Sequence, residues 1–233
     1  MIRLAILVAA ALLPVPALAQ ELGDALGAGL GDNAVLIVLG LTALSLAPGI
    51  AIMVTAFPFI VTVLSILRQA IGLQQAPPNM LIVSLAIFLT WFIMDPVLRD
   101  AWQVAGLPLQ EGSIGIAEAF QRGIVPFQNF MMARVDPDTL GTLADIAPGA
   151  GDPDRLSVLV PSFMLSEIQR AFEIGFLIAL PFLIIDLVVS AVLMSMGMMM
   201  VPPVVVSLPF KLAFFVTVDG WGMIAGALVR SYG

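Results

Sequence analysis

The 233-residue chain contains no cysteine and no histidine. Without cysteine it forms no disulfide and no thiolate site. Without either residue, the usual Cys/His zinc sites, Ser-His-Asp and Cys-His nucleophile systems and histidine-ligated haem are excluded. The sequence therefore predicts no catalytic residue, no metal site and no bound cofactor.

Charge is scarce as well. Only 11% of the residues are charged, 61% are hydrophobic, and the mean hydropathy is +1.10. Soluble globular domains contain about 25% charged residues and about 45–50% apolar ones. The net charge of −7 offers no basic surface for nucleic acid. The composition therefore predicts a membrane protein that does not bind nucleic acid.

Residues 1–19 have the pattern of a secretory signal peptide. Arg3 precedes an apolar run at 4–13 that is too short to span a bilayer, and an A-x-A sequence occupies 17–19. A short first transmembrane helix is the alternative, and two prolines directly after the apolar run argue against it. We expect cleavage after residue 19 and a short periplasmic N-terminus at 20–33.

Residues 34–98 are predicted to form a first helical hairpin region. The stretch 34–67 has no charged side chain, and as one helix it would be about 51 Å long, which exceeds a hydrocarbon core of about 30 Å. Breaks are expected at Pro48-Gly49 and at Pro58, so this stretch is a broken helix or a helical hairpin and not one span. A second apolar span is expected at 80–98.

Residues 99–173 differ from the rest, because they hold five of the nine basic residues and ten of the sixteen acidic ones. Asp136 followed by Pro137 is typical of a helix N-cap and first helical position. Glu167 and Arg170 share one helix face near the next apolar segment. We interpret this region as an acidic extramembrane (periplasmic) helical segment.

Residues 174–230 are predicted to form a second helical hairpin region around the sequence GMMMVPP. A charge inside an apolar helix usually has a partner or a water-filled cavity. Asp186 and Lys211 are equidistant in sequence from the turn, so an antiparallel hairpin would place them at one depth as an intramembrane charge pair. The alternative is that each faces solvent or another subunit.

The turn carries three consecutive methionines, Met198, Met199 and Met200, before a double proline. Methionine is flexible and fills irregular core gaps, but it is also enriched on surfaces that must repack. Three consecutive residues cannot all face one core on a helix of about 3.6 residues per turn. From the residues alone both interpretations stay open.

Four segments resemble the FliP family, the export-gate subunits of flagellar type III secretion, with more distant injectisome relatives. These are LSILRQAIG (64–72), APPNMLIVSLAIFLTWFIMDPV (76–97), SEIQRAFEIGFLIALPFLIIDLVVSAVLMSMGMMMVPP (166–203) and SLPFKLAFFVTVDGW (207–221). The resemblance implies an all-α membrane protein of kinked helical hairpins with an extramembrane helical segment, assembling into a pore complex. One departure is Pro58-Phe59, where the family usually has a polar Thr-Arg pair.

The resemblance also implies partners and roles. Several copies, five in the family, are expected to assemble with two smaller export-gate membrane proteins, FliQ-like and FliR-like, and to pass unfolded flagellar proteins through the centre. Met198, Met199 and Met200 match a pore gasket. Glu167, Arg170 and Arg230 are candidates for subunit contact. The expected location is the bacterial inner membrane, at the flagellar basal body.

Two other function classes compete with this one. An intramembrane protease needs a histidine beside a serine, or two facing aspartates framed by G-x-G-D, and the sequence has neither. A proton-coupled ion channel or small-solute transporter centred on Asp186 is the alternative. The predicted function is a non-enzymatic subunit of the flagellar protein export gate.

Overall fold

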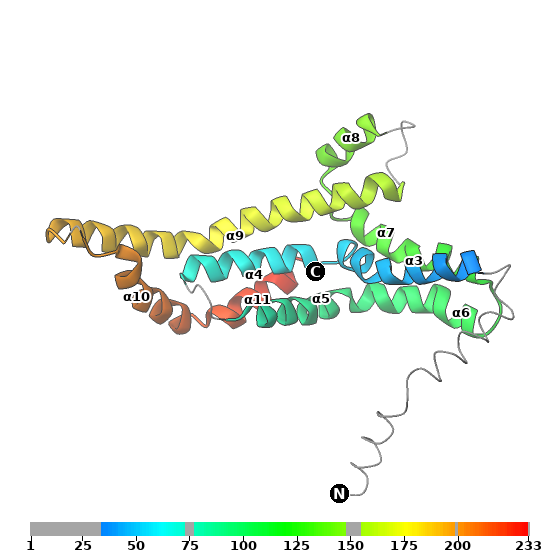
Figure 1. The fold of residues 1–233 in the computed structure, drawn as a ribbon, viewed down its shortest axis with the longest axis horizontal. Helices are drawn as coiled ribbons and strands as arrows, with labels where there is room; N and C mark the ends of the chain where they lie inside the picture. Colours follow the sequence, from blue (N-terminus) through cyan, green and yellow to red (C-terminus); the bar gives the residue numbers. More distant parts are fainter. Residues whose placement is uncertain (1–33, 73–76, 148–154, 199, 233) are drawn as a thin grey trace, which may run out of the picture. The chain divides into compact units, whose positions relative to one another are not determined.

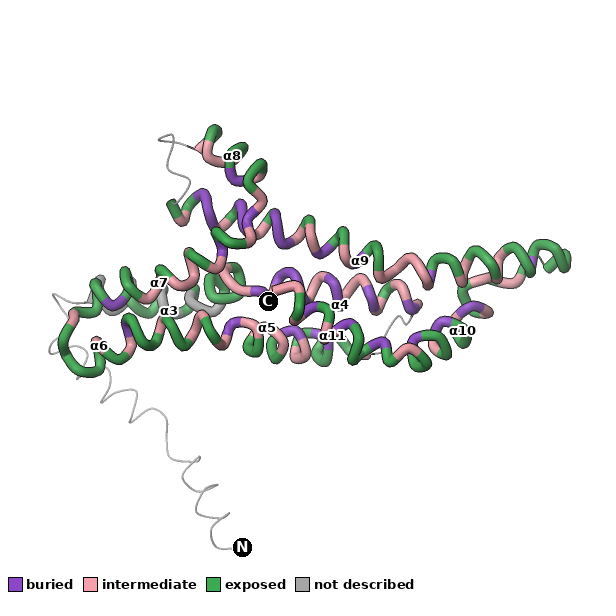
Figure 2. Tube along the Cα trace, turned by 180° about the vertical axis from the view of Figure 1, so that it is seen from behind, coloured by how far each residue is buried: buried purple, intermediate pink, exposed green. Residues whose placement is uncertain are grey.

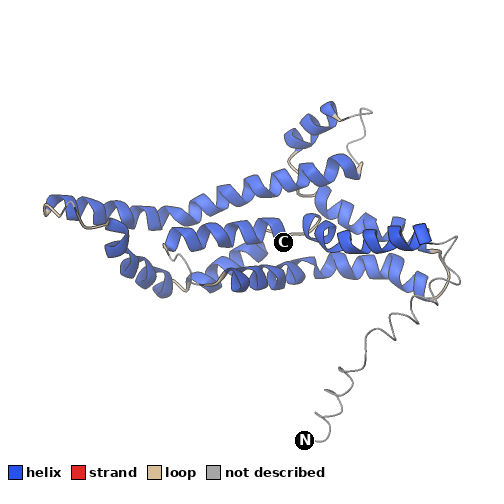
Figure 3. Ribbon diagram, in the orientation of Figure 1, coloured by secondary structure: helices blue, strands red, loops and turns tan. Residues whose placement is uncertain are grey.

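The computed structural model describes residues 34–72, 77–147, 155–198 and 200–232. All regular structure in these ranges is helical (Figure 3), so the prediction of an all-α protein is confirmed. Two helical stretches, Asn79–Gln110 and Leu156–Ser195, are long and apolar enough to cross a membrane, and a bent helix pair could be a third. The predicted signal peptide and periplasmic N-terminus lie outside the described residues.

The chain divides into two compact units, residues 1–49 and 50–233. Helix α3 (Ala34–Met53) crosses this division. The expected break at Pro48 and Gly49 is wrong, because α3 continues through both residues; an interior proline can kink a helix without ending it. The break expected at Pro58 is confirmed, since α3 ends at Met53 and the next helix begins at Phe57 with Pro58 in its first turn.

In the second unit, α4 (Phe57–Ile71) packs between α9 (Leu156–Ser195) and α5 (Asn79–Ala101) (Figure 1). Its buried residues recur every three or four positions, as expected for one helix face in a core; they include Phe59, Ile60, Val63, Leu64, Leu67 and Ile71. Gly72 ends the helix with a left-handed φ of 88°. Figure 2 shows the buried residues concentrated along α4.

Helix α5 continues past Pro96 into a π-helical turn, Trp102–Gly106, and the short α6 (Leu107–Gln110). The predicted region boundary at 98–99 therefore falls inside a helix. Helix α7 (Ile116–Met132) folds back along α5 and the π-helical turn.

Helix α8 (Pro137–Ile146) begins as predicted. Asp136 is its N-cap, the side chain accepts a hydrogen bond from the Thr139 amide at 2.9 Å, and Pro137 is the first helical residue. The helix packs on the start of α9. A second, smaller hydrophobic cluster forms there around Met131, Leu140, Val158, Leu159 and Phe163.

The 40-residue α9 runs through the predicted boundary at 173–174 without a break. Whether residues 99–173 lie outside the membrane stays a prediction. After the methionine turn, α10 (Pro203–Thr217) packs along the end of α9, and α11 (Gly220–Arg230) follows at an angle of 61°.

Candidate functional sites: the methionine turn and two buried charge clusters

The methionine turn begins at a defined helix end. Gly197 has φ 72°, its amide donates to Met194 O at 3.0 Å, and the Met198 amide donates to Leu193 O at 3.0 Å. This is the Schellman arrangement, in which glycine supplies the left-handed residue. The turn thus starts at residue 196, because the glycine ends α9.

The side chains at this turn point away from the core. Met200 is 97% exposed and Met198 is 42% exposed, while Met199 lies outside the described residues. Neither described methionine fills a gap inside this chain. The turn therefore presents flexible apolar side chains for contact with something outside the chain.

Asp186 and Lys211 lie against each other. Lys211 Nζ is 2.6 Å from Asp186 Oδ2 and also donates to the Ala70 carbonyl oxygen at 3.1 Å. The Ser207 hydroxyl donates to Asp186 Oδ1 at 2.5 Å. These contacts join α9, α10 and the last turn of α4.

The Lys211 side chain is only 4% exposed, whereas that of Asp186 is 29% exposed. A buried ammonium is costly unless opposite charge and hydrogen-bond acceptors compensate it. The carboxylate supplies the charge, and the C-terminal end of α4 adds a partial negative charge and a free carbonyl oxygen. Three helix segments are thus held at one point by one cation.

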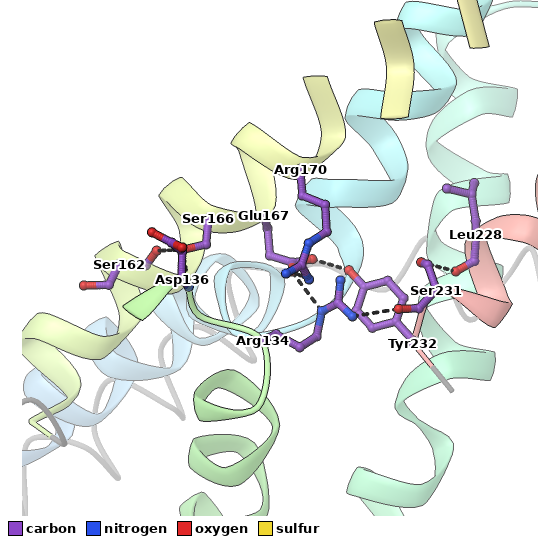
Figure 4. A network of polar contacts seen from close by, with 9 residues as sticks. All are labelled: Arg134, Asp136, Ser162, Ser166, Glu167, Arg170, Leu228, Ser231 and Tyr232. Atoms are coloured by element: carbon purple, nitrogen blue, oxygen red, sulfur yellow. Dashed lines mark hydrogen bonds and ion pairs between the residues drawn. The ribbon is translucent and has the colours of Figure 1, made fainter. Parts of the chain in front are cut away.

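The second cluster surrounds Glu167, which is fully buried (Figure 4). Arg134 Nε donates to Glu167 Oε1 at 2.9 Å, and Arg170 Nη1 lies 3.5 Å from the same oxygen. The Tyr232 hydroxyl donates to Glu167 Oε2. Each carboxylate oxygen therefore has at least one donor, as a buried charge requires.

Arg134 joins three segments of the chain. Its Nη1 donates to the Ser231 carbonyl oxygen at 2.9 Å, and its guanidinium lies over the Tyr232 ring, 3.6 Å from the centroid. Its buried Nη2 has no hydrogen-bond partner among the described residues, but the aromatic face provides a favourable cation–π contact. Burial and then the Glu167 charge raise the pKa of Tyr232 far above its ordinary value, so the phenol stays a donor.

The structure separates the three candidates for subunit contact. Glu167 is buried and makes its contacts with Arg134, Arg170 and Tyr232 inside the chain. Arg170, with a side chain 38% exposed, and Arg230, which is exposed, remain at the surface. Within the described residues Arg230 makes no ion pair.

The sequence alone did not predict five polar groups of these clusters: Arg134, Tyr232, Ser207 and the carbonyl oxygens of Ala70 and Ser231. Ser207 had a signal, since it precedes Lys211 by four positions and so shares its helix face. Tyr232 is the single tyrosine of the chain. The remaining contacts join segments far apart in sequence, which no local pattern encodes.

A family model described as the FliP family matches residues 40–228. The chain belongs to the FliP family. It is 47% identical to the flagellar biosynthetic protein FliP of Caulobacter vibrioides over 97% of this chain and 87% of that protein. The corresponding protein of Agrobacterium fabrum is 50% identical over 82% of this chain and 81% of its own length. That of Bacillus subtilis is 44% identical over 86% and 93%.

Membership of the FliP family confirms the resemblance seen in the sequence and the predicted function, a component of the flagellar type III export gate. The apolar helices agree with a place in a membrane. Nothing in the comparisons supports a small-solute transporter.

Proposed function

We propose that several copies of this FliP-family chain assemble with two smaller membrane proteins, FliQ-like and FliR-like, into a pore for unfolded flagellar proteins. Each copy contributes wall helices and one methionine turn, and the turns together close the pore at rest. The chain acts by shape and contact and catalyses no reaction. The complex lies in the bacterial inner membrane at the flagellar basal body, with the mature N-terminus in the periplasm.

The observation that carries this proposal is the exposed methionine turn. The 24 residues between Asp186 and Lys211 contain no charge, and the described methionines at the turn face away from the core. Unbranched thioether side chains repack around partners of different shape. A ring of such turns would exclude ions when closed and still adapt to many polypeptide sequences.

Helix α9 supports assembly with other protein chains. Its exposed large apolar side chains extend from Leu165 to Met194, about 44 Å at 1.5 Å per residue. A hydrocarbon core of about 30 Å covers only part of this length. Exposed apolar surface on this scale marks an interaction site, so neighbouring subunits are expected to cover the remainder.

The gasket is tested by replacing Met198, Met199 and Met200 together with alanine. Removing the side chains that fill the closed pore should let ions leak across the membrane, while export of flagellar proteins partly survives. The matched control replaces three exposed methionines away from the turn, Met80, Met132 and Met223, and should hold ions like the wild type. Unchanged conductance in the turn variant would contradict the gasket.

Assembly is tested by native mass spectrometry of the complex extracted in detergent. We expect multiple copies of this chain bound to two smaller membrane proteins. Deleting the gene should stop secretion of flagellar axial proteins without affecting small-solute uptake. A monomer without companions, or secretion that continues after deletion, would contradict the proposal.

A further inference from the structure

Tyr232 and Ser231 follow α11 and lie beyond residues 40–228, the part that the family model matches. Yet Tyr232 is held from several sides (Figure 4). Its hydroxyl donates to Glu167 on α9, and its ring lies under the Arg134 guanidinium at the end of α7. The ring also stacks with Phe130 of α7, centroids 6.0 Å apart, and meets the edge of Phe59 of α4 at 5.5 Å.

These contacts close a buried polar cluster that is incomplete without the end of α11. Removing the Tyr232 hydroxyl leaves Glu167 Oε2 with no hydrogen-bond donor among the described residues. A buried carboxylate oxygen without a donor is strongly unfavourable. The Ser231 carbonyl oxygen also accepts from Arg134. Arg134, which follows α7, and Glu167 of α9 therefore hold the end of α11 in place.

The other end of α11 is fixed to α10 by a packed corner. Asp219 takes a left-handed φ of 49°, and Phe215 meets Trp221 edge to face at 5.4 Å. A Cβ added at Gly220 would lie 2.1 Å from the Phe215 ring, so only glycine fits there. Along its length, α11 buries Ile224 in the main core. The position of α11 is thus transmitted to α10, which begins at the methionine turn.

We propose that Tyr232 is a positioning residue of the export gate. By completing the cluster of Arg134 and Glu167 it fixes α11, and through the corner at Gly220 it sets the position of α10 and of the methionine turn. This inference rests on the proposed function, because a position of the turn matters only if the turn closes a pore.

The test uses the absence of cysteine from the chain, since one introduced thiol is then the only one to react in this subunit. Ile224→Cys, at a position only 5% exposed, reports detachment of α11 through its rate of maleimide labelling. Met200→Cys reports the environment of the turn. Both are measured on assembled complexes in membranes, with and without Tyr232→Phe, which keeps the ring and removes only the hydroxyl.

We expect Tyr232→Phe to assemble normally and to raise both labelling rates roughly tenfold, because a hydrogen bond to a charged group changes a local opening equilibrium by about that factor. Export should fall in parallel. The matched control is Ser231→Ala, which retains the carbonyl oxygen that Arg134 uses and should change neither rate. Tyr232→Ala, which also removes the ring, should have the larger effect on any complex that assembles.

Two outcomes would overturn the inference. If neither rate changes in Tyr232→Phe, the hydroxyl does not hold α11. If the Ile224→Cys rate rises alone, the cluster fixes α11 but does not position the turn. If the turn does not close a pore, the alanine variant of the three turn methionines stays as tight to ions as the wild type. The two thiol reporters still test the role of Tyr232 in that case.

Discussion

The contact between Asp186 and Lys211 predicts two single variants of unequal severity. Asp186→Ala leaves a buried ammonium with only the Ala70 carbonyl oxygen, and an uncompensated buried charge costs about 3–5 kcal/mol. Lys211→Ala leaves a carboxylate that is 29% exposed and keeps the Ser207 hydroxyl, so the loss should be about 1–3 kcal/mol. The double variant removes both charges and should cost less than the sum, by about 1–3 kcal/mol.

The assay is a double-mutant cycle on the free energy of unfolding in mixed detergent micelles, accompanied by secretion of flagellar proteins in cells. The chain contains its own control in Asp95 and Arg99, an ion pair at 2.9 Å whose side chains are 42% and 73% exposed. The same cycle there should give a coupling below about 1 kcal/mol. Strictly additive losses for Asp186 and Lys211, or a larger loss for Lys211→Ala than for Asp186→Ala, would refute the reasoning.

Three further predictions concern other parts of the chain. The Thr139 amide and hydroxyl donate to Asp136 and lower its pKa; this stabilises α8 above the ordinary pKa of 3.8, and the effect is lost as the pH falls below it. The protection of the α8 amides against exchange, taken relative to the intrinsic exchange rate at each pH, should therefore fall in acid, and Asp136→Ala should abolish this dependence. Gly197→Ala should cost about 1–2 kcal/mol because an alanine resists the left-handed φ of 72°, measured by the same unfolding assay. N-terminal sequencing of the assembled protein should begin at Gln20, and recovery of the initiating methionine would contradict signal cleavage.

The features that sequence predicts well here depend on local chemistry. Helical content follows from long apolar runs without strand periodicity, and Asp136 with Pro137 specifies the start of α8 through one residue-to-backbone hydrogen bond. The proximity of Asp186 to Lys211 also follows from local geometry, because two helices joined by a turn pair positions equidistant from that turn. The 24 intervening residues lack any competing charge.

The features that sequence misses depend on tertiary context. Proline and glycine at 48–49 suggested a break, but α3 continues to Met53, because a proline inside a helix can kink it without ending it. The change in charge density near residue 173 suggested a boundary, yet composition along a helix says nothing about where its backbone stops. Arg134 and Tyr232 reach Glu167 across 33 and 65 positions, a separation that only packing can specify.

One consequence follows from the position of the Lys211 contact along α9. Among the polar contacts of the described residues, the bond from Lys211 to the Ala70 carbonyl is the one closest to the turn that reaches α4. Beyond it, an open apolar hollow of about 460 Å³ lies along the two arms, with Val188 and Val192 of α9 and Val206 and Phe210 of α10 in its lining.

From Asp186 to the end of α9, about 14 Å, the described residues of this hairpin therefore make no polar contact with α4. The apolar side chains that line this hollow lack packing partners on one side within this chain. The arms beyond the Lys211 contact are therefore held mainly by the helices on which they continue, α9 and α10, and through α10 by α11. Under the proposed function, a passing polypeptide would displace the turns by bending these arms, while the subunits stay in place.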